Sequence, residues 1–352
     1  MAFLVCKIFC AFLLPLIIFP SQLLAEIPSD VLQNIERVNR RGPSYAIIVA
    51  DKNQLSVVVS PENEAFKPDS EISRIDVSHS LRFHIGYMSD RRVIVVMSGR
   101  GLVNTARTTQ VLLNLFNIGA VVHYGRASNA NPDQLNIGDV AIPARIAHYG
   151  RFHWEKFGGD SGDYHRDIAK LTFSDHNLVK MRVPNRLESI YLQPEMVMTK
   201  PEVQEERFFI DVNQKLYRFA QKIEGLELAK CGPAIRSPKM CLQRQPMVRR
   251  VESGCSANID VNNVAFRDFL RNNLNITTID IESAGVALVC FNEKTPWLKM
   301  GSIFNFAGGA PPGGENDMAA IEGIWVSHLR VSLAELFRHL PETFPNPRLN
   351  IW

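Results

Sequence analysis

Two runs that combine glycine with arginine are the residues of this 352-residue sequence best suited to binding an anion. The first, Ser98-Gly99-Arg100-Gly101, lies between an apolar segment and an expected helix. Glycine there lets backbone N–H groups approach a ligand, and the start of a helix favours negative charge. The second run, YGRASN at residues 124–129, follows the next apolar segment, and strand ends are where α/β sheets bind ligands. A plain tight turn also accounts for the first run.

A carboxylate and an amide stand at the ends of two later segments. Glu282 follows Asp280 and Ile281, between an expected strand and an apolar helix. A buried carboxylate is costly unless it binds hydroxyl groups or caps the helix, so ligand binding and helix capping are both open for Glu282. Asn305 ends the last expected strand, where its amide can donate and accept hydrogen bonds. These groups predict a polar site at the strand ends.

The elements that must position these residues alternate between strand and helix. Apolar, β-branched runs predict strands at Ser44–Val49, Leu81–Met88 and Arg91–Met97, with a hairpin turn between the last two. The order strand, loop, helix and strand that follows is typical of βαβ units in a sheet covered by helices. Further strands are expected at 120–124, 139–147, 247–253, 275–281 and 297–304, and helices at 104–116, 213–223, 262–272, 282–291 and 316–339.

One α/β domain is the simplest account of the chain. It is expected to span residues 42–340, with a short segment at 26–41 before it and a tail at 341–352 after it. Residues 54–59 are ambiguous, and residues 150–201 follow no clean period, which indicates an irregular, loop-rich insertion. The content of 46% hydrophobic and 21% charged residues is that of an ordinary globular protein. The net charge of +3 gives no indication of a nucleic-acid partner.

The first 25 residues are typical of a secretory signal peptide. Lys7 is the only charged residue before Glu26, residues 8–19 are apolar, and Ala25 is a small residue suited to cleavage. A retained membrane anchor would need about 20 apolar residues, so cleavage is the favoured interpretation of the two. The mature chain is then expected to follow the secretory pathway to the vacuole or the extracellular space, without membrane association.

Four of the six cysteines remain in this mature chain. Cys231 and Cys241 flank a stretch rich in proline and lysine, which suits a local disulfide in an oxidising compartment. Cys255 and Cys290 stand in apolar surroundings and are expected to be buried thiols. No CxxC pair or histidine cluster accompanies them, so no metal site is expected. Asn275 begins a glycosylation sequon.

Two long runs resemble a known family. Residues 93–143 (VIVVMSGRGLVNTARTTQVLLNLFNIGAVVHYGRASNANPDQLNIGDVAIP) are similar to the purine nucleoside phosphorylase and nucleosidase superfamily, and most similar to its plant bark storage protein branch. Residues 278–309 (TIDIESAGVALVCFNEKTPWLKMGSIFNFAGG) resemble the same family's C-terminal half. The order and length of the two runs make the resemblance specific, and it covers roughly residues 42–340.

The resemblance implies a single three-layer α/β/α domain with a central mixed sheet. Active members cleave the N-glycosidic bond of nucleosides through a transition state that resembles an oxocarbenium ion. Such catalysis needs a nucleophile at the anomeric carbon, a grip on the ribose hydroxyls and a hydrogen bond or proton for the leaving base. The implied ligand is a small-molecule nucleoside, with phosphate as co-substrate if the reaction is phosphorolytic and with no cofactor. A homodimer is also implied.

By the same resemblance, Glu282 and Ile281 stand at the pair that binds ribose, with Ile281 in place of the usual Met. Asn305 stands where adenine-specific members carry an Asp that protonates the purine, and an amide cannot transfer a proton. Losing a general acid typically costs about 10²–10⁴ in rate. Asn305 suits a 6-oxopurine instead. Residues 256–259 supply no aromatic side chain to stack on the base.

On the nucleophile side, Gln54 replaces a Glu that activates water in hydrolytic members, which argues against an efficient nucleosidase. In a phosphorolytic member, Arg126 is open to two interpretations, because its guanidinium either binds phosphate or fills the pocket. A solvated surface position competes with anion binding for His123 and Arg100. The complete set of candidate phosphate contacts is Gly99, Arg100, Gly101, His123, Gly125 and Arg126.

Three functional hypotheses follow from these residues. The first is N-glycosidic cleavage of purine nucleosides, weakened or altered, with phosphorolysis favoured over hydrolysis. The second is a catalytically silent storage protein, which the substitutions at Gln54, Ser128 and Asn305 favour. The third is a protein that binds nucleosides or related bases without cleaving them. A fold alone does not decide among these three.

Overall fold

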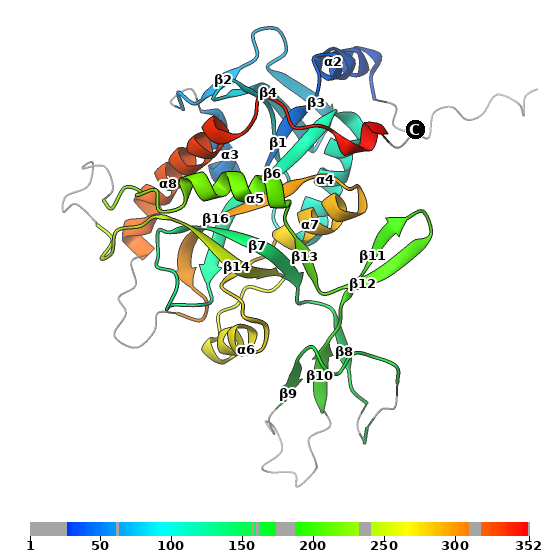
Figure 1. The fold of residues 1–352 in the computed structure, drawn as a ribbon, viewed down its shortest axis with the longest axis vertical. Helices are drawn as coiled ribbons and strands as arrows, with labels where there is room; N and C mark the ends of the chain where they lie inside the picture. The colour runs from blue at the N-terminus through cyan, green and yellow to red at the C-terminus, as the bar shows by residue number, and fades with distance from the viewer. Residues whose placement is uncertain are drawn as a thin grey trace, which may run out of the picture.

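The computed structural model describes residues 27–60, 63–156, 158–159, 162–173, 187–231, 241–309 and 318–350. The expected signal peptide at residues 1–25 lies outside the described residues. Within them, no helix is long and apolar enough to cross a membrane. A mixed sheet carries helices on both faces, which confirms the expected α/β class with its central mixed sheet (Figure 1).

In the part of the chain that the structure describes, the central sheet contains eleven strands. β1 (Ser44–Val49) is buried along its whole length and pairs in parallel with β5 (Arg91–Met97) on one side and β6 (Ile118–Asn129) on the other. β4 (Leu81–Met88) runs antiparallel to β5 through the expected hairpin. A strand that is covered on both faces is a continuous apolar run, which is why β1 and most of β5 are recognisable in the sequence. In β4 the buried residues are interrupted by Arg82 and His84, and the hairpin to β5 sets its end.

Five strands of this sheet close into a ring. β16 (Trp297–Phe306) pairs in parallel with β6 and antiparallel with β7 (Val140–His148). β14 (Val248–Ser256) pairs in parallel with both β7 and β15 (Thr278–Asp280), and β15 returns to β6 in the antiparallel sense. Closure leaves these strands without a free edge.

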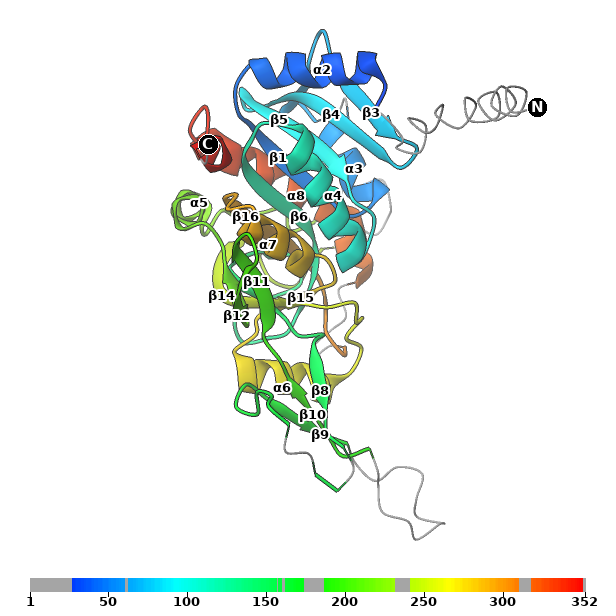
Figure 2. The same ribbon diagram turned by 90° about the vertical axis from the view of Figure 1, so that its right-hand side faces the viewer.

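Helices cover both faces of the sheet. α4 (Leu102–Leu115) and α7 (Ser283–Asn292) pack against each other on one face (Figure 2). α3 (Lys52–Val59) and α8 (Met318–His339) pack against each other on the other face. The remaining helical segments are α2 (Ser29–Arg40), α5 (Gln214–Ala220), α6 (Val264–Leu274), η1 (Gln221–Ile223) and η2 (Pro347–Asn350).

The segment 150–201 is more regular than expected. β8 (Phe152–Trp154), β9 (Lys170–Thr172) and β10 (Ser189–Leu192) form a small antiparallel sheet that projects from the body of the molecule (Figures 1 and 2). β11 (Glu195–Lys200) then pairs with β12 in a hairpin. Strands of three or four residues are too short to show a period of two in the sequence. The other strands not expected are β2 (Phe66–Pro68), β3 (Arg74–Ser78), β12 (Val203–Arg207) and β13 (Phe209–Asp211).

Two element boundaries differ for identifiable reasons. The ambiguous residues 54–59 belong to α3, because Asp51 accepts a hydrogen bond from the Gln54 N–H and so caps the helix. The strand expected at 275–281 is shortened to β15, because Asn275 ends α6 in the left-handed conformation with φ of 53°. Asn275 is exposed and its amide donates to Glu252, so its glycosylation stays a prediction.

The four cysteines divide into a disulfide and two thiols. Cys231 and Cys241 are joined in a disulfide across a sequence separation of ten residues. Residues 232–240 between them lie outside the described residues. Cys255 and Cys290 are free and buried, and burial raises the pKa of each thiol, which keeps both protonated.

Candidate functional site

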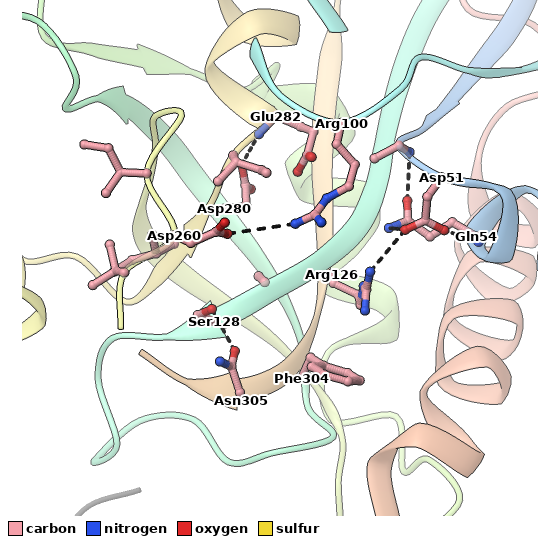
Figure 3. Close-up of a pocket in the computed structure, with 16 residues that line it drawn as sticks. Asp51, Gln54, Arg100, Arg126, Ser128, Asp260, Asp280, Glu282, Phe304 and Asn305 are labelled. Atoms are coloured by element: carbon pink, nitrogen blue, oxygen red, sulfur yellow. Dashed lines mark hydrogen bonds and ion pairs between the residues drawn. The ribbon is translucent and has the colours of Figure 1, made fainter. Parts of the chain in front are cut away.

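A polar cavity of about 240 Å³ opens where four strands of the sheet end. Its walls come from the segments that follow β1 and β15 and from the last residues of β6 and β16, with the loops before α4 and α6 at its mouth (Figure 3). It brings together residues far apart in the sequence, and their side chains point toward one another in Figure 3. The lining includes Asp51, Gln54, Arg100, Arg126, Ser128, Ile259, Asp260, Asp280, Ile281, Glu282, Phe304 and Asn305.

Glu282 is a buried carboxylate in the lining of this cavity, with 7% of its surface exposed. Its Oε1 accepts a hydrogen bond from the Gly101 N–H at 3.2 Å, which ties the start of α7 to the start of α4. Burial, and then the neighbouring charge of Asp280, raises the pKa of Glu282. In the part of the chain that the structure describes, Oε2 of Glu282 accepts no hydrogen bond, so it is available to a ligand.

The helix cap of α7 is supplied by Asp280 and not by Glu282. Asp280 Oδ1 accepts hydrogen bonds from the N–H of Glu282 at 3.0 Å and of Ser283 at 2.8 Å. The Glu282 side chain makes no capping hydrogen bond. The Glu282 side chain therefore lines the cavity without capping α7, and ligand binding by Glu282 stays a prediction.

Asn305 and Ser128 form a pair on the opposite wall of the cavity. The Ser128 hydroxyl donates to Asn305 Oδ1 at 2.7 Å, from β6 to β16. This contact fixes the amide so that its NH₂ group is turned away from Ser128 and can donate to a ligand (Figure 3). Ser128 thereby sets which hydrogen-bonding group Asn305 presents to the cavity.

Gln54 is held at both ends of its amide. Its Oε1 accepts from the Ala50 N–H at 2.8 Å, and its Nε2 donates to Asp51 Oδ2 at 3.1 Å. Only 3% of Gln54 is exposed. An amide that is satisfied in this way orients a neighbouring group but takes no proton from water.

Arg126 lies in the cavity between two aromatic rings. Its guanidinium donates to Asp51 Oδ2 at 3.2 Å, and it stacks 5.1 Å from the ring centroid of Phe304 and 5.6 Å from that of Trp325. About a third of its side chain is exposed, so it both occupies space and offers N–H donors to an anion. The two interpretations of Arg126 describe two aspects of one arrangement.

The glycine-rich loop before α4 uses its own backbone groups internally. Gly99 and Gly101 have φ of 86° and 88°, values that glycine adopts without strain. The N–H of Gly101 donates to Glu282 and that of Leu102 to Asn258, so side chains of this chain occupy the start of α4. Arg100 points into the cavity mouth, 3.9 Å from Asp260 (Figure 3).

Four of the six expected phosphate contacts, Gly99, Gly101, His123 and Gly125, do not line the cavity. His123 is fully buried in β6, and its Nδ1 hydrogen-bonds the Ile48 carbonyl at 3.2 Å. Burial, and then the charge of Lys299, lowers the pKa of His123, so the ring is neutral. A direct contact between His123 and phosphate is therefore wrong for this geometry. Gly125 is also buried, and a Cβ there would lie 3.4 Å from Gln54 Oε1, so it gives room to that amide.

Three residues of the cavity were not expected from the sequence. Asp51 supplies a carboxylate beside Gln54, and the Asp-x-x-Gln spacing of a helix start is the sequence signal that could have found it. Phe304 supplies an aromatic ring on the wall next to Asn305, and Asp260 supplies a second carboxylate at the mouth. Asp51 and Asp260 follow β1 and β14, and Phe304 lies in β16 where its register with β6 is irregular. Among the described residues, no cluster of His, Cys, Asp and Glu could hold a metal ion.

The comparison with known proteins agrees with this fold. Residues 44–325 match the family described as the phosphorylase superfamily, and the chain belongs to that family. It is 28% identical to bark storage protein A of Populus deltoides over 293 residues, which are 82% of this chain and 88% of that protein. A 5'-methylthioadenosine/S-adenosylhomocysteine nucleosidase of Staphylococcus aureus is 35% identical over 80 residues, 23% of this chain and 34% of that one.

Solved structures show the same fold. The futalosine hydrolase of Helicobacter pylori superposes with a TM-score of 0.55 at 17% identity, covering 85% of this chain and all of that chain. The 5'-methylthioadenosine/S-adenosylhomocysteine nucleosidase of Streptococcus pneumoniae has the same TM-score and coverage at 13% identity. The expected family and its plant bark storage protein resemblance are confirmed.

Proposed function

We propose that this cavity binds a purine nucleoside and cleaves its N-glycosidic bond by phosphorolysis at a low rate. The observation that carries the proposal is the buried carboxylate of Glu282, which faces the cavity with Oε2 uncommitted while Asp280 caps the helix. A carboxylate in this state is suited to accept hydrogen bonds from two neighbouring ribose hydroxyls.

Phosphate suits the nucleophile side better than water does. Water needs a group that takes its proton, and Gln54 cannot take one. Phosphate is already an anion and needs no general base, and Arg100 and Arg126 offer guanidinium donors in the same cavity. In the step proposed, a phosphate oxygen bonds to the anomeric carbon as the C–N bond breaks. The electron pair of that bond leaves with the base.

The leaving base receives a hydrogen bond and no proton from the protein. The NH₂ group of Asn305, oriented by Ser128, donates to the departing base, and the base takes its proton from solvent. Losing a general acid typically lowers the rate by about 10²–10⁴, so slow turnover is expected. The reaction needs phosphate as co-substrate and no other cofactor.

The test is product analysis with the mature chain, residues 26–352. Inosine and adenosine are incubated with and without phosphate, and free base and ribose 1-phosphate are separated by chromatography. Base release that depends on phosphate, and that Glu282→Gln abolishes, is the expected result. Base release without phosphate would identify a hydrolase and overturn the phosphorolytic step.

A storage protein is the second candidate, favoured by the similarity to bark storage protein A over 82% of the chain. The ion pair between Arg126 and Asp51 across the nucleophile side also supports it. Storage predicts that neither inosine nor phosphate raises the melting temperature, whereas binding to the native state must raise it. With either function, we also propose a signal peptide at residues 1–25, delivery to the vacuole or the extracellular space, and a homodimer.

A further inference from the structure

Three ionisable side chains that the proposed reaction does not use are buried together beside the cavity. Lys299 lies in the middle of β16 with 2% of its side chain exposed, and its Nζ is 3.0 Å from Asp280 Oδ2. His123 lies opposite Lys299 in the register of β6 and β16, and both side chains belong to the buried interior. The His123 Nε2 has no hydrogen-bond partner in the part of the chain that the structure describes.

Asp280 connects this buried lysine to the cavity. One of its oxygens, Oδ1, accepts from the N–H groups of Glu282 and Ser283 and so shapes the turn on which Glu282 stands. The other, Oδ2, faces Lys299 and the Ser283 hydroxyl. The chain of contacts therefore runs from Lys299 through Asp280 to the backbone of Glu282.

A buried lysine at this position lowers the stability of the fold unless its charge is paired with an opposite one. The neighbours of Lys299 along β16 are apolar and buried, as in Trp297, Leu298 and Met300. Burying an ammonium group without a partner is strongly unfavourable, and a buried carboxylate left without its cation is equally so. The ion pair of Lys299 and Asp280 thus offsets part of the cost of burying each charge, and the hydrogen bonds from Glu282 and Ser283 also favour the charged form of Asp280.

We propose that Lys299 is a positioning residue that holds Glu282 in its ligand-binding place and in its charged form, acting through Asp280. The role of Glu282 in binding hydroxyls rests on the proposed function. The hold of Lys299 on Glu282 rests on the contacts alone. No contact between Lys299 and a nucleoside is part of the proposal.

The charged and titratable groups around Glu282 can all be named. Asp280 raises the pKa of Glu282, and Lys299, the Gly101 N–H and Arg100 lower it, while burial gives the largest upward shift. Asp280 is faced by Lys299 and His123 and lies near the thiol of Cys255 and the hydroxyl of Tyr149. Lys299 is the one cation in this group whose ammonium lies inside the protein, since Arg100 is more than half exposed.

The first experiment needs no ligand. Carboxyl carbons of the isotope-labelled mature chain are titrated by NMR in the wild type and in Lys299→Met, and the Glu282 midpoint is compared. We expect the midpoint to rise by about one pH unit or more, because an opposite charge nearby is removed. Lys215→Met, which removes an exposed lysine of α5, is the matched control and should leave the midpoint unchanged.

The second experiment measures inosine affinity by calorimetry over the same pH range. Lys299→Met should weaken binding by about tenfold or more, because hydrogen bonds to a charged acceptor are lost. The double variant Asp280→Asn with Lys299→Met should recover most of this affinity, since an amide oxygen still accepts from Glu282 and Ser283 and no charge stays unpaired. A lysine that only supports the fold would lower the melting temperature and leave both the affinity and its pH profile unchanged.

The outcomes separate the two proposals. A folded Lys299→Met protein with the wild-type Glu282 midpoint overturns the role of Lys299. A shifted midpoint in a chain whose wild type binds no inosine keeps that role and overturns the proposed function. If Lys299→Met does not melt cooperatively, Asp280→Asn alone decides. That variant removes the carboxylate that raises the pKa of Glu282, so its midpoint must fall, and an unchanged midpoint contradicts the proposal.

Discussion

Asn305 and Gln54 are the two positions where an amide stands at the chemistry of this site. The amide of Asn305 is oriented by Ser128, and that of Gln54 is satisfied at both ends by Ala50 and Asp51. Amides fix hydrogen-bond direction but move no proton at ordinary pH. In the proposed function, Asn305 faces the base and Gln54 faces the nucleophile, and two amides at these places favour binding over fast turnover.

Restoring a proton donor at residue 305 should raise the rate. In Asn305→Asp, the Ser128 hydroxyl still has an oxygen to bond, and the new carboxyl group can give a proton to the leaving base. We expect base release from adenosine to increase by about 10²–10⁴, measured by chromatography of the products. Asn273→Asp, at an exposed position of α6, is the control. An unchanged rate in a folded Asn305→Asp protein would remove Asn305 from the base site.

The raised pKa of Glu282 predicts how binding depends on pH. Only the carboxylate accepts hydrogen bonds from two hydroxyls, so affinity is full above this pKa and is lost as the pH falls through it. The acid midpoint for inosine binding should therefore lie above the ordinary value of 4.5. Glu282→Gln should weaken binding by about 1.5–3 kcal/mol and abolish this acid limb, as calorimetry at several pH values would show. Glu36→Gln, on the exposed side of α2, should behave as the wild type.

At the scale of elements, the start of α4 and the start of α7 are fastened to each other. The Gly101 N–H donates to Glu282, and the neighbouring Leu102 N–H donates to Asn258. A helix start with free N–H groups binds anions readily, and here two side chains of the same chain take that place. The loop of Gly99 and Gly101 thus positions Glu282, and in the proposed reaction Arg100 and Arg126 remain as the groups that offer donors to phosphate.

Gly101→Ala tests this junction. Gly101 has φ of 88°, and an added Cβ would lie 3.0 Å from Asn258 Oδ1, so both backbone strain and crowding result. We expect a loss of about 1–2 kcal/mol in the free energy of unfolding together with weaker inosine binding, measured by denaturant melts and calorimetry. Gly225→Ala is matched for strain, since φ is 80° with no atom near the added Cβ. It should lose stability alone, and equal affinities in the two variants would show that the junction does not serve the site.

At the scale of the molecule, the ring of β6, β16, β7, β14 and β15 joins the N-terminal and C-terminal halves of the chain. The cavity lies where β1 adds to this ring, so its residues come from both halves. The disulfide between Cys231 and Cys241 lies on the connection between η1 and β14. It stabilises a local loop and leaves the cavity walls unconstrained.

Reduction of this disulfide should lower stability without changing the site. A closed loop of this length is worth about 3 kcal/mol through the entropy of the unfolded chain. We expect the double variant Cys231→Ser with Cys241→Ser to lose that amount of unfolding free energy. Denaturant melts with and without reductant measure this loss. Reductant should leave the melt of this variant unchanged, because Cys255 and Cys290 are already thiols. An unchanged inosine affinity is also expected, and a lost affinity would contradict the separation of loop and cavity.

The sequence by itself determined β1 and the buried part of β5, because a strand that is covered on both faces leaves an unbroken apolar run. It also determined the family and the residue types at Glu282, Asn305 and Gln54. The sequence did not predict the three-residue strands β8 and β9 of segment 150–201, because so short a run shows no alternation of apolar and polar residues.

Only the tertiary structure decided which polar groups of the site are hydrogen-bonded or ion-paired to one another. The register of β6 and β16 places Ser128 beside Asn305, and the bend after β1 brings Asp51 to Arg126. In the folded chain His123 is buried outside the cavity lining, and Lys299 forms an ion pair with Asp280. A hydrogen bond or an ion pair depends on distance and burial between residues far apart in the chain, and spacing along one segment does not contain that information.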